Sequence, residues 1–311
     1  MSKTALLFAG QGAQVVGMGK DLAEKFPSAK EWFERATSVL GYDLTSICFN
    51  GPEAELTKTE NAQPGIFLVS WVAFQLLKEQ LPSLSFQATA GLSLGEFTAL
   101  TAAEAMSFED GVKLVRQRGR FMQEACDATR GGMAAIIGLE EAPTREVCAQ
   151  AGVVLANLNC PGQLVISGET EKIAQACELA KTKGARRALP LPVAGAYHSP
   201  LMASAQPKLQ AELAAVKIAE PKVTVVSNVA AQPHNGVDSI RSRLVQQVTS
   251  SVRWEESMRH LLADGFTRFI ELGPGTALSG FMKRIEKNAI VLNVADEASL
   301  DVTSKSLAPV T

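Results

Sequence analysis

Histidine and cysteine are scarce in this sequence, and their scarcity restricts the chemistry available to it. Among 311 residues there are three histidines, His198, His234 and His260, and five cysteines. No C-x-x-C pair occurs and the number of cysteines is odd, which argues against a zinc ribbon and against the disulfide framework of a secreted protein. We therefore expect reduced, buried thiols.

Long apolar runs and an excess of charge of one sign are also absent. The longest apolar stretch, Ile66–Leu77, is shorter than the roughly 20 residues of a bilayer span, and it is apolar on all sides, which predicts a buried helix. The apolar segment at the N-terminus is too short for a signal peptide, and the net charge is −2. We expect a cytoplasmic protein that binds neither membranes nor nucleic acids.

A chain of this length exceeds the usual size of a single-core domain, so we expect a large domain and a smaller one. Continuously apolar runs alternate with helical patterns, which predicts an α/β body with a parallel sheet covered by helices. The expected strands are Thr4–Ala9, Phe86–Gly91, Val223–Asn228, Thr267–Leu272 and Ile290–Val294. The expected helices are Pro27–Leu40, Gly65–Gln80, Glu96–Ala105, Phe108–Cys126, Pro200–Val216, Ile240–Thr249 and Trp254–Asp264.

The order of predicted elements changes between Gly131 and Pro192, where strands and helices follow the βαββαβ order of a ferredoxin-like unit. We expect residues 129–194 to form an inserted small subdomain, with residues 1–128 and 195–295 forming the body. The polar segment 296–311 has no aromatic residue and is expected to be mobile.

The glycine-rich segment Gly10-Gln11-Gly12 follows the first strand but does not match a nucleotide-binding loop. The third glycine of a dinucleotide motif is replaced by Val15. A P-loop ending at Gly19-Lys20 would need Ser or Thr in place of Asp21 and Gly in place of Gln14. What remains is a flexible turn whose amides are available to a negative oxygen.

A serine lies between two glycines at a predicted strand–helix junction, in the segment Gly91-Leu92-Ser93-Leu94-Gly95. This is the setting of a G-x-S-x-G nucleophile elbow, in which a tight turn exposes the serine hydroxyl. The helix that follows directs its free amides at developing negative charge. The alternative is an ordinary turn in which Ser93 caps a helix.

A nucleophilic serine needs a base, and three histidines are available. His260 lies on a charged helix face and His234 in a polar surface turn, so we expect both to be solvated. His198 precedes Ser199 and Pro200, a good helix start, at a junction between predicted domains. We favour His198 as the base, although it could instead bond only to nearby backbone. No Asp or Glu stands out as its orienting partner.

Arg118 lies on an apolar stripe of its predicted helix. Its neighbours three and four residues away are Leu114, Val115, Phe121 and Met122. A guanidinium there must be paired or reach a polar cavity. It therefore either pairs with a buried carboxylate or grips an anionic group of a substrate.

Taken together, these residues resemble the malonyl-CoA:acyl carrier protein transacylases from about Thr4 to Glu286. Several ordered motifs carry the resemblance. They are Phe8–Gln14, similar to FPGQGSQ; Gly91–Glu96, similar to GHSLGE; Arg116–Gly119, similar to the family's arginine segment; Gly195–Ser199, similar to GAFHS; Gln247–Trp254, similar to QxxxPVxW; and Glu271–Gly275, similar to ExGPG.

The resemblance implies an α/β-hydrolase-like body with a parallel sheet and an inserted ferredoxin-like subdomain. It implies ping-pong transfer of malonyl from malonyl-CoA to the phosphopantetheine thiol of acyl carrier protein, with no metal or other cofactor. Ser93 would be the nucleophile, His198 the base, and the amides of Gln11 and Leu94 the oxyanion hole. We expect a monomer that serves fatty acid or polyketide synthesis, a choice the sequence leaves open.

The resemblance also implies a substrate pocket in which Arg118 binds the malonyl carboxylate. Gln63 and Gln247 are expected there too, Gln247 on the segment whose backbone carbonyl orients the histidine. Leu92 stands where the family commonly has histidine, and Tyr197 replaces a phenylalanine. Two other activities stay open: hydrolysis of acyl thioesters on the same fold, and carrier-protein docking without catalysis.

Overall fold

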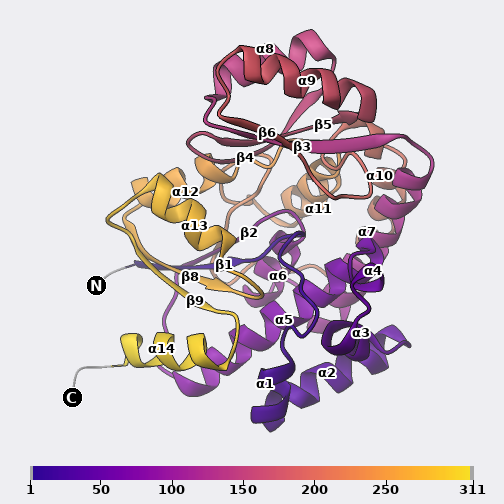
Figure 1. Ribbon diagram of the computed structural model, residues 1–311. Coiled ribbons are helices and arrows are strands. Elements are labelled where there is room, and N and C mark those ends of the chain that lie inside the picture. The colour runs from indigo at the N-terminus through magenta and orange to yellow at the C-terminus, as the bar shows by residue number, and fades with distance from the viewer. Residues whose placement is uncertain (1–2, 309–311) are drawn as a thin grey trace. The chain divides into compact units, whose positions relative to one another are not determined.

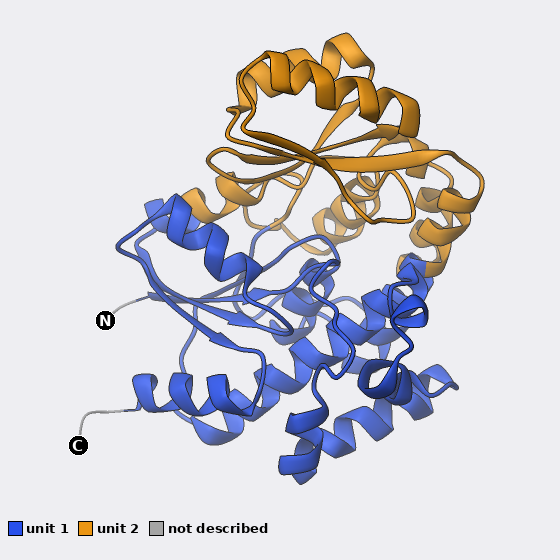
Figure 2. Cartoon of the chain, in the orientation of Figure 1, with its two compact units in different colours: residues 1–119, 216–226, 261–311 blue, residues 120–215, 227–260 orange. Residues whose placement is uncertain are grey.

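The computed structural model describes residues 3–308. By its internal contacts the chain divides into two compact units (Figure 2). Unit 1 comprises Met1–Gly119, Val216–Val226 and Leu261–Thr311, and unit 2 comprises Arg120–Ala215 and Ser227–His260.

Unit 1 is built on a five-stranded parallel sheet in the order β7-β2-β1-β8-β9. The strands are β1 (Lys3–Phe8), β2 (Ala88–Gly91), β7 (Thr224–Val225), β8 (Phe266–Leu272) and β9 (Ile290–Val294). Four of them lie within two residues of their predicted bounds. β7 is shorter than predicted. A bond from Val226 N to Thr89 O still joins this segment to β2, and the chain then leaves the sheet.

Helices pack on this sheet; Figure 1 shows α13 on one side and α5 and α14 on the other. The central strand β1 is buried after its first residue, with Ala5 through Phe8 at 0% exposure, as its continuously apolar sequence predicts. The helices of unit 1 are α1 (Lys20–Lys25), α2 (Pro27–Leu40), α3 (Leu44–Asn50), α4 (Glu53–Leu56), α5 (Thr59–Gln80), α6 (Gly95–Ala102), α13 (Ala277–Ile285) and α14 (Glu297–Leu307).

Helix α5 begins earlier than its sequence predicts. The prediction starts at Gly65, after Pro64, whereas α5 begins at Thr59 and includes Pro64. Pro64 is the sixth residue of α5 and has no N–H, so it cannot make the helical bond to Glu60 O four residues before it. The stretch Ile66–Leu77 is buried as predicted, apart from Gln75. The early start places Gln63 on the helix, which matters for the site.

Unit 2 contains the predicted βαββαβ arrangement as an antiparallel sheet in the order β4-β5-β3-β6. Helices α8 (Glu141–Ala151) and α9 (Thr170–Thr182) pack on it around a core of aliphatic residues and cysteines. The predicted fold class, a parallel α/β body with a ferredoxin-like subdomain, is confirmed. The strands are β3 (Gly131–Ile137), β4 (Val154–Cys160), β5 (Gln163–Glu169) and β6 (Arg187–Pro190).

Unit 2 extends beyond the predicted insert 129–194. It also holds η1 (Pro200–Met202), α10 (Ala205–Ala215) and α11 (Val237–Gln247). The segment after α11 is tied to β4 by two backbone bonds of Val252, which donates to Ala156 O at 2.8 Å and accepts from Leu158 N at 2.9 Å. Two of the four divisions between the units along the chain fall within helices, one in α7 (Phe108–Asp127) and one in α12 (Trp254–Ala263).

The segment predicted to be a mobile tail forms α14, over Glu297–Leu307; residues 309–311 lie outside the described residues. A capping box starts this helix: Asp296 Oδ1 accepts from Ser299 N at 2.8 Å, and Ser299 Oγ accepts from Asp296 N at 3.0 Å. Leu300 and Thr303 are buried. The prediction relied on polar composition and overlooked the cap.

Replacing the cap, Asp296→Ala, is expected to lower the free energy of unfolding by about 1 kcal/mol. The exposed Asp301, which forms an ion pair with Lys305 one turn further on, is the matched control. Asp301→Ala is expected to cost less than about 0.5 kcal/mol. Urea denaturation of both variants checks this, and equal losses would contradict the role of the cap.

Among residues 3–308, no helix combines the length and the apolar character that crossing a bilayer requires.

Candidate active site

Ser93 lies on a sharp turn in unit 1, between the carboxyl end of β2 and the start of α6. Its φ angle is 53°, in the left-handed region that residues other than glycine rarely adopt. The turn is closed by a bond from Gly95 N to Leu92 O at 2.9 Å, and Leu92 N bonds to Phe8 O at 3.1 Å. The strand–turn–helix setting predicted for the G-x-S-x-G segment is therefore present.

Glycine is required at this turn by the close approach of strand and helix. A Cβ on Gly91 would lie 1.9 Å from both the C and the O atoms of Gly95. We expect Gly91→Ala to cost more than about 4 kcal/mol or to prevent folding, because backbone atoms would have to move. Gly280→Ala on α13 is the control, since nothing lies within 4 Å of its added Cβ. Soluble yield and denaturation measure both, and a stable Gly91→Ala protein would contradict this reading.

Arg118 lies on α7 and brings two polar side chains of unit 1 together at its guanidinium. Its Nη1 donates to Gln63 Oε1 at 2.7 Å and its Nη2 donates to Ser93 Oγ at 3.0 Å. Gly119 permits the approach of α7 to α5, because a Cβ there would lie 2.5 Å from Thr59 O. Three predicted site residues, far apart in sequence, thus meet in one place.

The guanidinium of Arg118 is almost completely buried, at 1% exposure. The predicted apolar stripe around it is confirmed, since its helical neighbours Leu114, Val115, Phe121 and Met122 are all buried. The Arg118 Cζ also lies 5.6 Å from the centre of the Phe97 ring. A buried cation that hydrogen-bonds to a neutral amide and a hydroxyl can accommodate a carboxylate in its neighbourhood.

His198, in unit 2, is oriented by the end of a helix. Its Nδ1 lies 2.8 Å from the backbone oxygen of Gln247, the last residue of α11. Since a carbonyl oxygen only accepts, Nδ1 carries a proton in this contact, and Nε2 is the basic nitrogen of the neutral ring. The carbonyls of a helix C-terminus carry partial negative charge, which stabilises an imidazolium. His198 therefore has an orienting partner although no acidic one was found.

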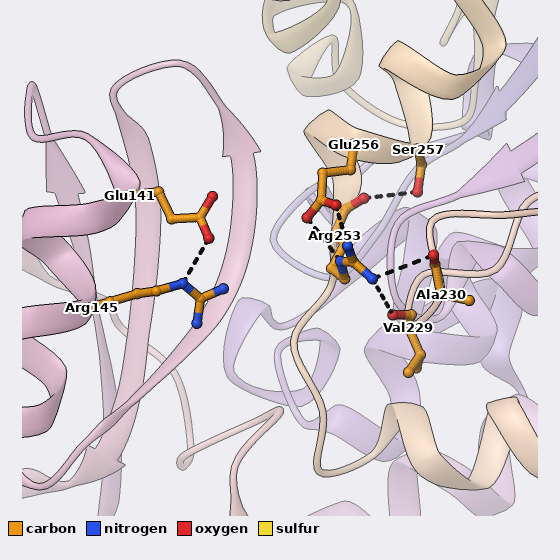
Figure 3. A network of polar contacts seen from close by, with 7 residues as sticks. All are labelled: Glu141, Arg145, Val229, Ala230, Arg253, Glu256 and Ser257. Carbon is orange, nitrogen blue, oxygen red and sulfur yellow. Dashed lines mark hydrogen bonds and ion pairs between the residues drawn. The ribbon is translucent and has the colours of Figure 1, made fainter.

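A polar network in unit 2 holds the chain beside Gln247. The Gln247 Nε2 donates to Asn228 Oδ1 at 3.4 Å, and Arg253 N donates to Asn228 O at 2.9 Å. The Arg253 guanidinium forks onto the Glu256 carboxylate, while its Nη1 donates to the backbone oxygens of Val229 and Ala230 at 3.4 Å (Figure 3). The sequence did not indicate a role for Asn228 or Arg253, because contacts between residues distant in the chain leave no local pattern.

Gln11 and Leu94, whose amides are the predicted oxyanion hole, lie on the two loops beside Ser93. The loops touch, since a Cβ on Gly10 would lie 2.6 Å from Leu92 O. The Gln11 side chain donates to Thr59 Oγ1 at 3.3 Å. Leu94 is buried and forms the N-cap of α6, where backbone donors have no partner within the helix.

The other two histidines are each partly buried, against the expectation that they would be solvated, whereas His198 is 4% exposed. Within residues 3–308, no group of three or more His, Cys, Asp or Glu side chains is placed to hold a metal ion.

All five cysteines are buried and reduced, as the sequence predicts. Burial raises the pKa of Cys48 to about 12 and the pKa values of Cys126 and Cys148 to about 11. The Tyr197 hydroxyl, adjacent to His198 in sequence, hydrogen-bonds to Cys126. These thiols are poor nucleophiles at neutral pH.

A serine strained at the carboxyl end of a parallel strand, beside a buried guanidinium, is an arrangement consistent with the serine-dependent acyl-transfer enzymes. The family model described as acyl transferase domain matches residues 5–305, and the chain belongs to that family.

Similar proteins align over nearly the whole chain. The malonyl CoA-acyl carrier protein transacylase of Bacillus subtilis is 45% identical over 312 residues, covering 99% of this chain and 98% of the relative. The solved transacylase of Coxiella burnetii has a TM-score of 0.95 at 38% identity, over 98% of both chains. PlMCAT, a malonyl-transacylase solved with its type II PKS acyl-carrier protein AntF, has a TM-score of 0.95 at 37% identity, over 98% of this chain and all of the other.

Proposed function

We propose that this protein transfers a malonyl group from malonyl-CoA to the phosphopantetheine thiol of acyl carrier protein. One observation carries the proposal: Nη2 of the buried Arg118 lies 3.0 Å from Oγ of the partly buried Ser93. An acyl group on Ser93 starts beside a fixed positive charge, which suits an acyl group that ends in a carboxylate. The names of the similar proteins support the same activity.

The first half-reaction forms an acyl-enzyme. Ser93 Oγ attacks the thioester carbonyl of malonyl-CoA while Nε2 of His198 takes the hydroxyl proton. The C–S bond then breaks, the thiolate of CoA takes that proton from His198, and a malonyl ester remains on Ser93. The Gln247 carbonyl, 2.8 Å from Nδ1, stabilises the imidazolium that forms between these steps.

The second half-reaction returns the malonyl group to a thiol. The phosphopantetheine thiol of the carrier protein gives its proton to His198 and attacks the ester carbonyl. The ester C–O bond breaks, and Ser93 recovers the proton. The negative oxygen formed in both halves is stabilised by the amides of Gln11 and Leu94, a contribution of about 3–4 kcal/mol per donor in comparable sites.

Arg118 selects the acyl group in this scheme. Its fork matches a carboxylate in bidentate fashion, and Gln63 Oε1, at 2.7 Å from Nη1, holds the fork in position. Gln247 contributes its backbone oxygen to His198, and its side chain bonds to Asn228. A neutral acyl group would leave the buried cation without the charge that matches it.

The test separates transfer from hydrolysis. Radiolabelled malonyl-CoA alone is expected to label Ser93, identified by peptide mapping, and holo-acyl carrier protein is expected to remove the label as malonyl-carrier protein. Apo-carrier protein, which lacks the thiol, is the control and should leave the label in place. Release of free malonate as the main product would point to a hydrolase, and carrier binding without any label on the protein would point to a docking protein.

We also propose a monomer that acts in the cytoplasm without nucleic acid. The one chain supplies every site residue named above, which supports a monomeric enzyme. Five reduced cysteines support a reducing compartment, and a net charge of −2 supports the lack of a nucleic-acid partner.

A further inference from the structure

One amide side chain joins the chain that follows His198 to the helix end that orients it. Gln206, near the start of α10, donates Nε2 to Val245 O at 3.2 Å and to Thr249 Oγ1 at 3.1 Å. These acceptors lie two residues before and two residues after Gln247. The Gln206 amide therefore bonds to residues on both sides of Gln247, whose carbonyl contacts His198.

The backbone bonds at the C-terminal end of α11 are weak. Beyond the helix the backbone is held by long turn bonds, from Val248 N to Val245 O at 3.3 Å and from Ser250 N to Gln247 O at 3.4 Å. Helix ends with weak bonds fray, and the direction of their last carbonyls varies. The direction of the Gln247 carbonyl thus depends on contacts from outside α11.

Gln206 is itself fixed relative to His198 by a continuous series of turns. Ser199 Oγ bonds to Ala196 O at 2.6 Å and caps η1. Backbone bonds then run from Met202 N to Ser199 O at 3.0 Å and from Gln206 N to Ala203 O at 3.1 Å. One short, bonded segment therefore carries both the histidine and the amide.

We propose that Gln206 is a positioning residue for the transfer reaction. It sets the Gln247 carbonyl on Nδ1 of His198, and so keeps Nε2 directed for proton transfer, without touching the substrate. The inference rests on the proposed function, because it requires His198 to be the base that activates Ser93.

The first test removes the donor. Gln206→Leu keeps a similar size but cannot donate, and Gln206→Glu keeps the shape but replaces the donor with an acceptor. In both variants kcat for malonyl transfer is expected to fall about 10- to 100-fold, the scale of a misdirected catalytic group. The KM for malonyl-CoA should change less than about threefold, because the acyl and CoA contacts remain. Gln210→Ala, exposed and one turn further along α10, is the matched control and should keep the wild-type kcat.

The second test asks whether Gln206 acts through His198. The rate of Ser93 acylation is measured for wild type, Gln206→Leu, His198→Ala and the double variant. Gln206→Leu is expected to lose its effect in the His198→Ala background, whereas a merely structural role would slow both backgrounds equally. Thermal unfolding of each variant shows that it folds.

The outcomes separate the two proposals. If His198→Ala is strongly impaired but both Gln206 variants keep kcat within about twofold, the positioning role alone is overturned. If Gln206→Leu slows acylation by the same factor with and without His198, the positioning role is again overturned. If His198→Ala acylates at the wild-type rate, the proposed mechanism fails, and the role of Gln206 fails with it.

Discussion

Ser93→Ala is expected to lower kcat/KM for malonyl transfer by about 10⁴-fold or more and to abolish labelling by malonyl-CoA. Removal of a catalytic serine eliminates the covalent route, and what remains is substrate binding and the oxyanion donors. The strained φ of 53° at this position supports a nucleophilic role, because such a conformation persists only where surrounding structure enforces it.

The matched control for this substitution is Ser28→Ala, which removes a hydroxyl bonded to Glu79 away from the site. It is expected to keep wild-type activity. Denaturation of both variants and initial-rate kinetics with holo-carrier protein complete the comparison. A folded Ser93→Ala protein that transfers malonyl at more than a tenth of the wild-type rate would overturn the acyl-enzyme mechanism.

Arg118→Ala is expected to reverse acyl selectivity. Loading of malonyl onto Ser93 should fall about 10²- to 10³-fold, because a desolvated charge pair of this kind contributes about 2–5 kcal/mol. Loading of acetyl, which has no carboxylate, should fall much less or rise, since its binding no longer buries an unmatched cation. The rate of malonyl loading in Arg118→Lys should lie between those of the wild type and Arg118→Ala, because lysine keeps the charge but lacks the bidentate guanidinium.

Arg120→Ala is the control, because Arg120 is two residues away on the same helix, exposed, and paired with Glu124. The measurement is the ratio of kcat/KM for malonyl-CoA to that for acetyl-CoA in each variant. Equal losses for the two substrates would refute the assignment of Arg118 to the carboxylate and leave it a structural role.

Features with a local pattern were predictable from the sequence. The continuous apolar runs predicted the parallel strands, and the glycine spacing around Ser93 predicted its strand–turn–helix setting. The helical neighbours of Arg118 predicted a buried guanidinium, which is 1% exposed. In each case the residues that decide the outcome lie within a few positions of one another.

Features that depend on contacts between distant segments were not predictable from the sequence. The bond from Arg118 to Gln63 joins positions 55 residues apart and requires α5 to continue through Pro64. The contacts of Gln206 with the end of α11, and of Asn228 with Gln247, involve side chains that could equally well face solvent. The helix α14 was missed for another reason, since polar composition outweighed its capping signal.

The buried cysteines have a consequence for a protein that handles thiols and thioesters. Both substrates in the proposed reaction are thiol carriers, and an accessible thiolate could take the malonyl group from the thioester of malonyl-CoA, releasing CoA as the thiol. Burial, which raises the pKa values of Cys48, Cys126 and Cys148, suppresses this side reaction. In the proposed mechanism, Ser93 therefore meets no competition for the malonyl group from these three thiols.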